Sequence, residues 1–486
     1  MDASIKALHK NFMEWAAGPV GSITLHIVGL VLLFLFASLI TPKQPEPEIE
    51  VQMIEVDEQK LDELLEEKPP EELPELVDTV TPPDVNMEIT PPEVEDFTAA
   101  PADVTPTELI IASDAISPIV MKGLAPGQMS NRSGSGRAAA IGTYGGKWGQ
   151  YAEAAVLRAL EWLRINQNQD GSWGTNDKEA MAGLGILTFL AHGETTASVK
   201  YGQTVERAIR YLVAKQNEKG EFAKTDTTAG TYSQAICVYA ISEAYGMTRI
   251  PSLKSVMEKG AQLLIDGQQA KGGYDYKFAK GDRRDTSLGG WCCQAMKAAY
   301  IAGAENANLH EAMEKAVQDM KSVQKAEDGS FYYSKIAASH STHGITAVAV
   351  LSMQLLGHAE DSEVSRGMDF LGGADCKWES PPDWPMYAWY YISQTKFHKG
   401  GATWTAWNNQ FAPQFIRNQS PDGHWDSPGL KLGAGATGRE NMHPVYATTL
   451  AALTLQVYYR FLPTYKPIEV EKIDQTSDDD VTIEIL

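Results

Sequence analysis

The sequence predicts an all-α protein made of repeated helical hairpins, and two observations carry that prediction. A motif of the form Gln, three residues, Gly, one residue, aromatic recurs along the later two thirds of the chain. Each copy lies between an amphipathic helical stretch and a more apolar one, as the spacing of apolar residues indicates. Repetition at a fixed period is typical of a repeat architecture. We therefore expect an α6/α6 toroid with the apolar helices inside and the amphipathic helices outside.

The number of hairpins follows from the spacing of the motif. Its glutamines are separated by 49, 52, 56 and 95 residues. Because the last interval is nearly twice the others, we expect a degenerate copy midway, and "LGGADCKW" at residues 371–378 stands there. Asp-Gly or Lys-Gly supplies a tight turn, and Gln with the aromatic residue can tie neighbouring turns together. The clear copies begin at Gln167, Gln216, Gln268, Gln324 (with one extra residue) and Gln419.

Over residues 148–463 the motif and its copy number resemble the prenyltransferase/squalene oxidase repeats of the terpenoid cyclase and protein prenyltransferase toroids. The resemblance implies the fold and a cavity at the start of the inner helices, but it says little about chemistry. The toroid sequence lacks the Asp-x-Asp-Asp run with which squalene-hopene-type cyclases protonate their substrate, and it lacks the magnesium motif of class I terpene synthases. We therefore expect no cyclase activity and no cofactor.

The prenyltransferase resemblance also implies where zinc ligands would stand. That family uses Asp-x-Cys at the start of one inner helix and a histidine on the next. Here Asp383 and His443 match, but Pro385 replaces the cysteine, and Cys376 lies only a few residues upstream. Capping or hydrogen bonding by His443 is the favoured interpretation, and a zinc site made of Cys376, Asp383 and His443 is the alternative.

Polar and aromatic residues near the expected inner-helix starts are the candidates for a cavity. Asp285 in "RRDTS" is most simply a helix N-cap, with a cavity role as the alternative. The two histidines of "SHSTHG" favour a polar rim over a metal site, because no third ligand is evident. Aromatic residues are dense around position 390, and they suit core packing or an aromatic-lined cavity. The candidates are Asp285, His340, His343, Asp383, Trp384, Tyr387, Trp389, His443 and Tyr446.

Before the repeats, the chain predicts a membrane anchor. Val20–Ile40 is a run of 21 residues without a formal charge, which as a helix is about 30 Å long, the thickness of a bilayer core. A cleaved signal peptide is the alternative, but its apolar region would be shorter and followed by a clear cleavage site. Lys6 and Lys10 precede the run, which favours residues 1–19 in the cytoplasm.

Residues 41–147 predict an acidic linker that is rich in proline and then in glycine and serine. Between Thr41 and Ile110 lie 21 acidic residues, three lysines and 12 of the 25 prolines, within a chain of net charge −22. Such a segment buries too little apolar area to offset its ordering entropy, so we expect an extended tether. Residues 464–486 form a second acidic segment at the end of the chain.

Ser22 and His26 lie four residues apart, so a helix places them on one face. An anchor with Ser-x-x-x-His, followed by a Pro/Glu-rich tether, resembles the N-terminal region of the TonB family. That resemblance implies that Ser22 and His26 contact ExbB/ExbD-like motor subunits.

Together these features predict a single-pass inner-membrane protein with a periplasmic toroid. The favoured function is a binding or scaffold module, coupled to an ExbB/ExbD-like proton-driven motor, with an apolar or glycan ligand, and the prediction leans against an enzyme. The alternative is an enzyme of cyclase, transferase or lyase type that acts on an isoprenoid or other lipid in the toroid cavity. No basic patch is visible, so nucleic acid is not an expected partner.

Overall fold

The structure is a computed structural model that describes residues 132–334, 341–428 and 444–460, all within one compact unit, Glu55–Leu486. The predicted anchor, most of the tether and the acidic tail lie outside these residues. So do the predictions for Ser22, His26, His340 and His443. Within the described ranges, no helix combines the length and the apolar character needed to cross a bilayer.

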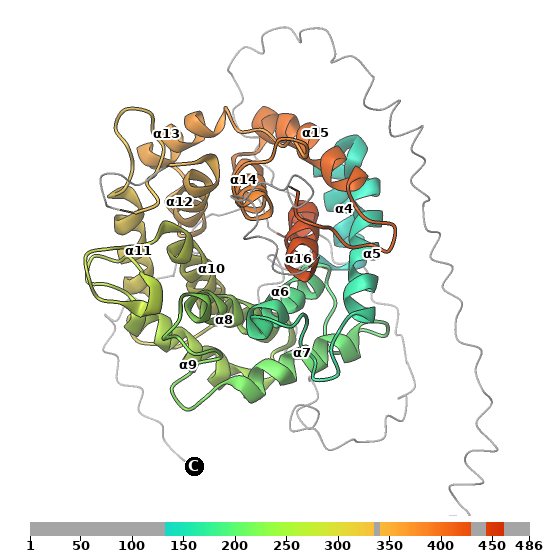
Figure 1. Cartoon of the computed structure of the whole chain (residues 1–486), viewed down its shortest axis with the longest axis horizontal. Coiled ribbons are helices and arrows are strands. Elements are labelled where there is room, and N and C mark those ends of the chain that lie inside the picture. The colour runs from blue at the N-terminus through green and yellow to red at the C-terminus, as the bar shows by residue number, and fades with distance from the viewer. Residues whose placement is uncertain (1–131, 335–340, 429–443, 461–486) are drawn as a thin grey trace, which may run out of the picture. The chain divides into compact units, whose positions relative to one another are not determined.

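The inner ring consists of six helices, each beside the next, with the last beside the first (Figure 1). Their sequences are apolar almost all round, and their residues are accordingly buried almost throughout, as is typical of a helix enclosed on every side. The six are α6 (Lys178–Ala191), α8 (Thr228–Thr248), α10 (Thr286–Ala302), α12 (His343–Leu355), α14 (Pro385–Lys399) and α16 (Pro444–Leu455).

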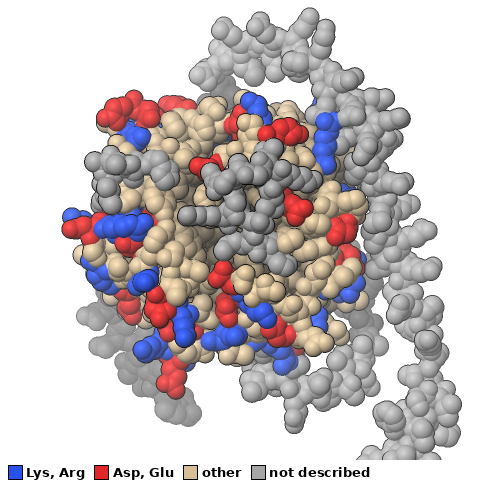
Figure 2. Space-filling view, viewed as in Figure 1, with Lys and Arg blue, Asp and Glu red and all other residues tan. Residues whose placement is uncertain are grey.

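Six amphipathic helices surround the inner ring. In α7, for example, Val205, Ala208, Ile209 and Leu212 are buried at helical spacing, while the other face is exposed. The first outer helix packs beside the last, so the ring closes, and the predicted all-α toroid of six hairpins is confirmed for the described chain. The outer helices are α5 (Gly149–Ile165), α7 (Gly202–Lys215), α9 (Pro251–Gly267), α11 (Leu309–Lys321), α13 (Ser362–Leu371) and α15 (Gly401–Arg417). In Figure 2 charged side chains are dense over α7, α9 and α11.

The repeated glutamine fastens each turn to the next outer helix. Gln268 Nε2 donates to the carbonyl of Gly272 in its own turn, at 2.9 Å, and to that of Ala312 in α11, at 2.8 Å. Gly272 has a φ of +94°, and a Cβ there would collide with the carbonyl oxygen of Lys315. Gln419 makes the bond that closes the ring, to the carbonyl of Ala155 at 2.8 Å. The equivalent pairs are Gln167 with Thr204, Gln216 with Val256 and Gln324 with Glu363.

The hairpins give the toroid two different ends. Each outer helix leads through a motif turn into an inner helix, so the N-termini of all six inner helices lie at one end, the turn end. We call the other end the opposite end. It also holds two short helices, α4 (Gly134–Tyr144) and α17 (Val457–Arg460). Helix α4 lies within residues 41–147, which the sequence predicted to be a linker. The short helices η3 (Gly146–Trp148) and η4 (Tyr276–Phe278) complete the described elements.

Buried polar side chains fill the axis toward the opposite end. Arg460 donates to the hydroxyls of Tyr239, at 2.6 Å, and Tyr390, at 3.2 Å. Arg132 pairs with Glu243 at 2.6 Å and donates to the backbone carbonyl of Arg460 at 3.4 Å. Tyr239 lies on α8 and Tyr390 on α14, so Arg460 joins two inner helices that are not neighbours in the ring.

Candidate functional site

At the turn end, Asp285 caps the N-terminus of α10 and has no exposed surface. Its Oδ1 atom accepts hydrogen bonds from the backbone N–H of Leu288 at 2.9 Å, from the hydroxyl of Ser287 at 2.7 Å and from that of Tyr232 at 3.2 Å. A cap of this kind satisfies one of the free N–H groups at a helix start. One oxygen of Asp285 is therefore fully occupied by its own helix and by α8.

The other oxygen of Asp285, Oδ2, is buried and accepts no hydrogen bond of good geometry from any described residue, although the hydroxyls of Tyr276 and Tyr333 lie close enough to the Asp285 carboxylate to interact with it. Its nearest cationic partner is Nη2 of Arg283, at 3.7 Å. Leaving a buried acceptor without a donor costs about 1–3 kcal/mol, and more when the group is charged. Such a group needs an explanation other than folding.

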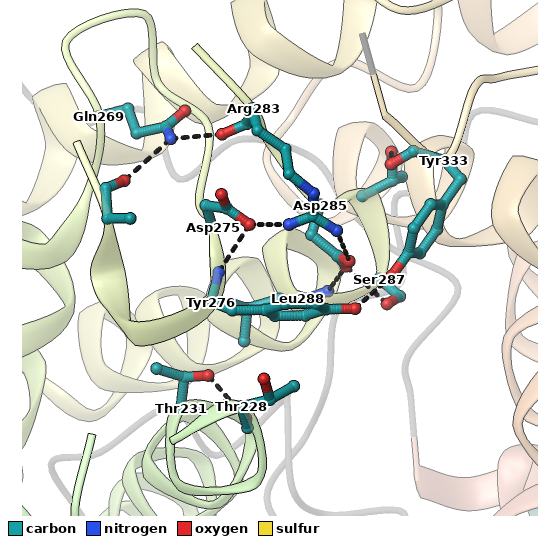
Figure 3. Close-up of polar contacts among 12 residues, drawn as sticks. Thr228, Thr231, Gln269, Asp275, Tyr276, Arg283, Asp285, Ser287, Leu288 and Tyr333 are labelled. Atoms are coloured by element: carbon teal, nitrogen blue, oxygen red, sulfur yellow. Dashed lines mark hydrogen bonds and ion pairs between the residues drawn. The ribbon is translucent and has the colours of Figure 1, made fainter. Parts of the chain in front are cut away.

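Arg283 links Asp285 to a second carboxylate (Figure 3). Its guanidinium forms an ion pair with Asp275, lies near Asp285 and stacks over the ring of Tyr276, 4.6 Å from the ring centroid. Asp275 also accepts from the backbone N–H of Tyr276 at 2.7 Å. One arginine thus holds two carboxylates at the turn end.

Four tyrosines from separate parts of the chain surround the carboxylate. Tyr232 lies on α8, Tyr276 in η4, Tyr333 before α12 and Tyr387 on α14. The hydroxyls of Tyr276 and Tyr333 share a hydrogen bond, and that of Tyr387 donates to the carbonyl of Ser287 at 3.4 Å. Burial and then the charge of Asp285 raise the pKa of each phenol, so all four stay protonated at neutral pH. The Asp285 cluster comprises Tyr232, Asp275, Tyr276, Arg283, Asp285, Ser287, Tyr333 and Tyr387.

A buried ion pair holds the loop that carries this cluster. Arg284, next to Arg283, is almost fully buried, and its Nε donates to Oδ2 of Asp319 on α11 at 2.7 Å. Gln269 Nε2 donates to the carbonyl of Arg283 at 2.6 Å. Asp319 and Gln269 therefore hold the backbone of the loop. Arg284 is buried against α11, whereas Arg283 contacts the carboxylates of Asp275 and Asp285.

Of the residues predicted from the sequence, the structure brings Asp285 and Tyr387 together. Tyr446 stands close to Tyr387, whose pKa is raised by burial, by Asp285 and then by Tyr446. Trp389 is fully buried on another side of α14, where its ring stacks on that of Trp378, 5.6 Å away between centroids. Trp389 therefore lies in the core between helices rather than in this cluster.

The other candidates are dispersed. His343 is half-buried with its ring against Phe370, and burial followed by the charge of Lys396 lowers its pKa. Asp383 is exposed. Burial and then Asp375 raise the pKa of the Cys376 thiol, which disfavours the thiolate that metal binding needs. No cluster of three potential ligands for a metal ion occurs within the described residues.

Sequence reasoning missed most of the cluster. Tyr232, Asp275, Tyr276 and Tyr333 were not singled out, and Arg283 was noticed only as part of "RRDTS". The available signal was the loop "YDYKFAKGDRRD", which combines acidic, basic and aromatic residues directly before an inner helix.

No protein-family model matches the sequence, and no curated protein matches it. Among solved structures, the chain is similar to the glycoside hydrolase family 76 α-1,6-mannanase of Salegentibacter sp. HEL1_6, at 12% identity over 64% of this chain and 99% of the other, with a TM-score of 0.47. It is also similar to a family 76 mannosidase of Bacteroides thetaiotaomicron, at 10% identity over 64% and 98%, with a TM-score of 0.45. A third is a possible member of glycoside hydrolase family 105 from Klebsiella pneumoniae, at 10% identity over 64% and 93%, with a TM-score of 0.45.

These comparisons correct two predictions. The neighbours are carbohydrate enzymes, which corrects the predicted motor-coupled binding or scaffold module in favour of its enzyme alternative as the reading to be tested. The terpenoid cyclase-like and TonB-like character is corrected too, because the neighbours named above are glycoside hydrolases. The membrane anchor falls on residues outside the described ranges, and it and the periplasmic location stay predictions. At such low identities and TM-scores, neither the substrate nor the reaction of a neighbour transfers to this chain.

Proposed function

We propose that this protein is an enzyme that performs acid–base chemistry on a glycan at the Asp285 cluster. The observation that carries the proposal is Oδ2 of Asp285, a buried carboxylate oxygen without a hydrogen bond of good geometry from any described residue. A substrate hydroxyl would supply the missing donor. Buried ionisable groups of this kind gather at active sites, because catalysis needs acceptors that folding leaves unused.

The cluster supplies a proton acceptor and several hydrogen-bond donors. As a carboxylate, Asp285 accepts a proton from the substrate or from water. The phenols around it have raised pKa values, so they remain protonated and act as hydrogen-bond donors to oxygen atoms of the substrate rather than as proton donors. Arg283 offsets one of the two negative charges of Asp275 and Asp285. This combination suits cleavage of a glycosidic bond, by hydrolysis or by elimination.

The same geometry favours a glycan over an isoprenoid. A hydrocarbon chain offers no donor to Oδ2, and packing it against a carboxylate and an arginine would remove them from water without compensation. A sugar ring offers several hydroxyls, each of which can donate to a carboxylate and accept from a phenol or a guanidinium.

Assaying the full chain on a panel of neutral and uronate-containing polysaccharides tests the proposal, with reducing ends reporting any cleavage and ultraviolet absorbance reporting elimination. Asp285→Asn should lower kcat about 10²–10⁴-fold, the usual contribution of a general acid or base. Asn still caps a helix, so α10 should remain folded. Asp282→Asn, an exposed acid on the same loop, is the matched control and should act like wild type. Cleavage of no polysaccharide, or full activity of Asp285→Asn, would contradict the proposal.

A further inference from the structure

Trp384 has two features that folding does not explain. Its side chain is 42% exposed, which is unusual for so large an apolar group among the described residues. Its backbone is left-handed, with φ 53° and ψ 57°, a conformation that is unfavourable for a bulky residue. Its side chain makes no capping hydrogen bond at the start of α14. Strained residues that stabilise nothing visible are a reason to look for function.

The position of Trp384 connects it with the Asp285 cluster. It begins α14 at the turn end, and its carbonyl accepts the first helical hydrogen bond, from Ala388 at 2.8 Å. Tyr387, in the same first turn, donates to the carbonyl of Ser287 on α10 at 3.4 Å. Ala388 also packs against Gly344 at the start of α12. The first turns of α10, α12 and α14 are thus contiguous, and Trp384 is the exposed aromatic residue among them.

We propose that Trp384 is a stacking subsite for a sugar ring beside the ring on which Asp285 acts, an inference that rests on the proposed function. An exposed indole presents a flat apolar surface, which packs against the C–H face of a sugar. Pro381, Pro382 and Pro385 restrict the backbone around it, so little entropy is lost when a ligand binds. Exposed Asp383, next in the chain, is available to accept hydrogen bonds from the hydroxyls of that ring.

The subsite implies that the enzyme prefers longer oligosaccharides to shorter ones. A substrate too short to reach Trp384 gains nothing from it, whereas a longer oligosaccharide gains binding free energy remote from the reacting bond. KM should therefore fall with chain length in the wild type.

Kinetics of the full chain on oligosaccharides of graded length test the subsite, using the polysaccharide that the wild type cleaves as their source. Trp384→Ala should raise KM about tenfold for the longer substrates. The value of kcat, and KM for the shortest substrate, should stay unchanged. Trp384→Phe should recover most of the loss, since stacking needs a ring. Val199→Ala removes a fully exposed apolar side chain at the opposite end and should change nothing.

Trp384→Gly separates binding from folding. Glycine adopts left-handed backbone without strain, so the melting temperature should stay constant or rise, while retardation in a native gel containing the polysaccharide is lost. Asn308→Gly is the control, because Asn308 is also left-handed, with φ 66°, at the opposite end. It should keep both retardation and the melting temperature.

The outcomes distinguish the two proposals. If the wild type cleaves a glycan and Trp384→Ala keeps its KM at every length, the subsite is wrong and the proposed function stands. If no glycan is cleaved or retarded, both fail.

Discussion

At the opposite end of the toroid, partly buried carboxylates pair closely with buried cations, whereas at the turn end Oδ2 of Asp285 lies 3.7 Å from the nearest cation and accepts no hydrogen bond of good geometry from any described residue. Arg132 lies 2.6 Å from Glu243, and the ring nitrogens of His192 each lie 3.0 Å from a carboxylate, Glu153 or Glu194. The opposite end joins α4 and α17 to the ring, so its charges serve to close the structure. Asp285 caps its helix with one oxygen, and its other oxygen has only the more distant Arg283 as a charged partner.

The difference shows how to separate a structural charge from a functional one in the same fold. A pair that folding needs is satisfied within the chain, and losing either partner destabilises the protein. A group kept for chemistry costs stability, so removing it stabilises the protein and destroys activity. The following predictions test that distinction.

The largest effect should come from breaking the opposite-end ion pair. Arg132→Met leaves the carboxylate of Glu243 largely buried without its cation, and the free energy of unfolding should fall by about 3–5 kcal/mol in denaturant titrations. Adding Glu243→Leu to the same chain should recover most of the loss. An effect below about 1 kcal/mol would mean that water solvates the Glu243 carboxylate in place of Arg132, and that the fold does not depend on this ion pair.

A smaller effect should follow from removing one glutamine of the turns. Gln268→Ala deprives the carbonyls of Gly272 and Ala312 of their donor, and unfolding should become easier by about 1–3 kcal/mol. Lys271→Ala, an exposed change in the same turn, is the control and should leave the denaturation midpoint unchanged. Equal midpoints for the two variants would show that the repeated glutamine is not needed to hold the ring.

The turn end should respond with the opposite sign. Asp285→Asn keeps the helix cap and removes the charged acceptor, so the free energy of unfolding should rise by about 1 kcal/mol, measured by denaturant titration. A loss of more than about 1 kcal/mol would place Asp285 with the structural charges and break the comparison.

The smallest effect should be a pH dependence of stability at the opposite end. Burial alone would lower the pKa of His192, but hydrogen bonds with Glu153 and Glu194 outweigh it and raise that pKa. A raised folded-state pKa means that protonated His192 stabilises the fold below about pH 6.5, the ordinary value, and that this contribution is lost as pH rises through the folded-state pKa. His192→Gln should flatten the melting temperature over that range. An identical pH profile in the variant would show that His192 does not cause the pH dependence of stability.

Low pH should also lower the stability of the opposite end, through protonation of Glu153. Burial alone would raise the pKa of Glu153, but the hydrogen bonds with His192 and Tyr459 and the charges of His192 and Arg137 together outweigh burial and lower that pKa. The contribution of Glu153 is therefore present above about pH 4.3, the ordinary value, and is lost as pH falls through the folded-state pKa.

By itself, the sequence determined the fold class, the number of hairpins and the ring to which each helix belongs. The reason is that these depend on local patterns: the period of the motif, the apolar periodicity of each stretch and the turn chemistry of Asp-Gly. The recurrence of the glutamine in five copies indicated a contact between repeats, but the structure directs it to the backbone of the next outer helix and not to the neighbouring turn.

Only the tertiary structure decided which of these residues form a site. Tyr232, Tyr333 and Tyr387 are far apart in the chain, and closure of the ring brings them to one carboxylate. Tyr387 and Trp389 were both candidates for an aromatic-lined cavity. In the structure Tyr387 belongs to the Asp285 cluster, whereas Trp389 is buried against Trp378 in the core. Successive helical residues turn by about 100°, so two positions apart point to nearly opposite sides, and what lies on each side is set by neighbouring helices that no local pattern specifies.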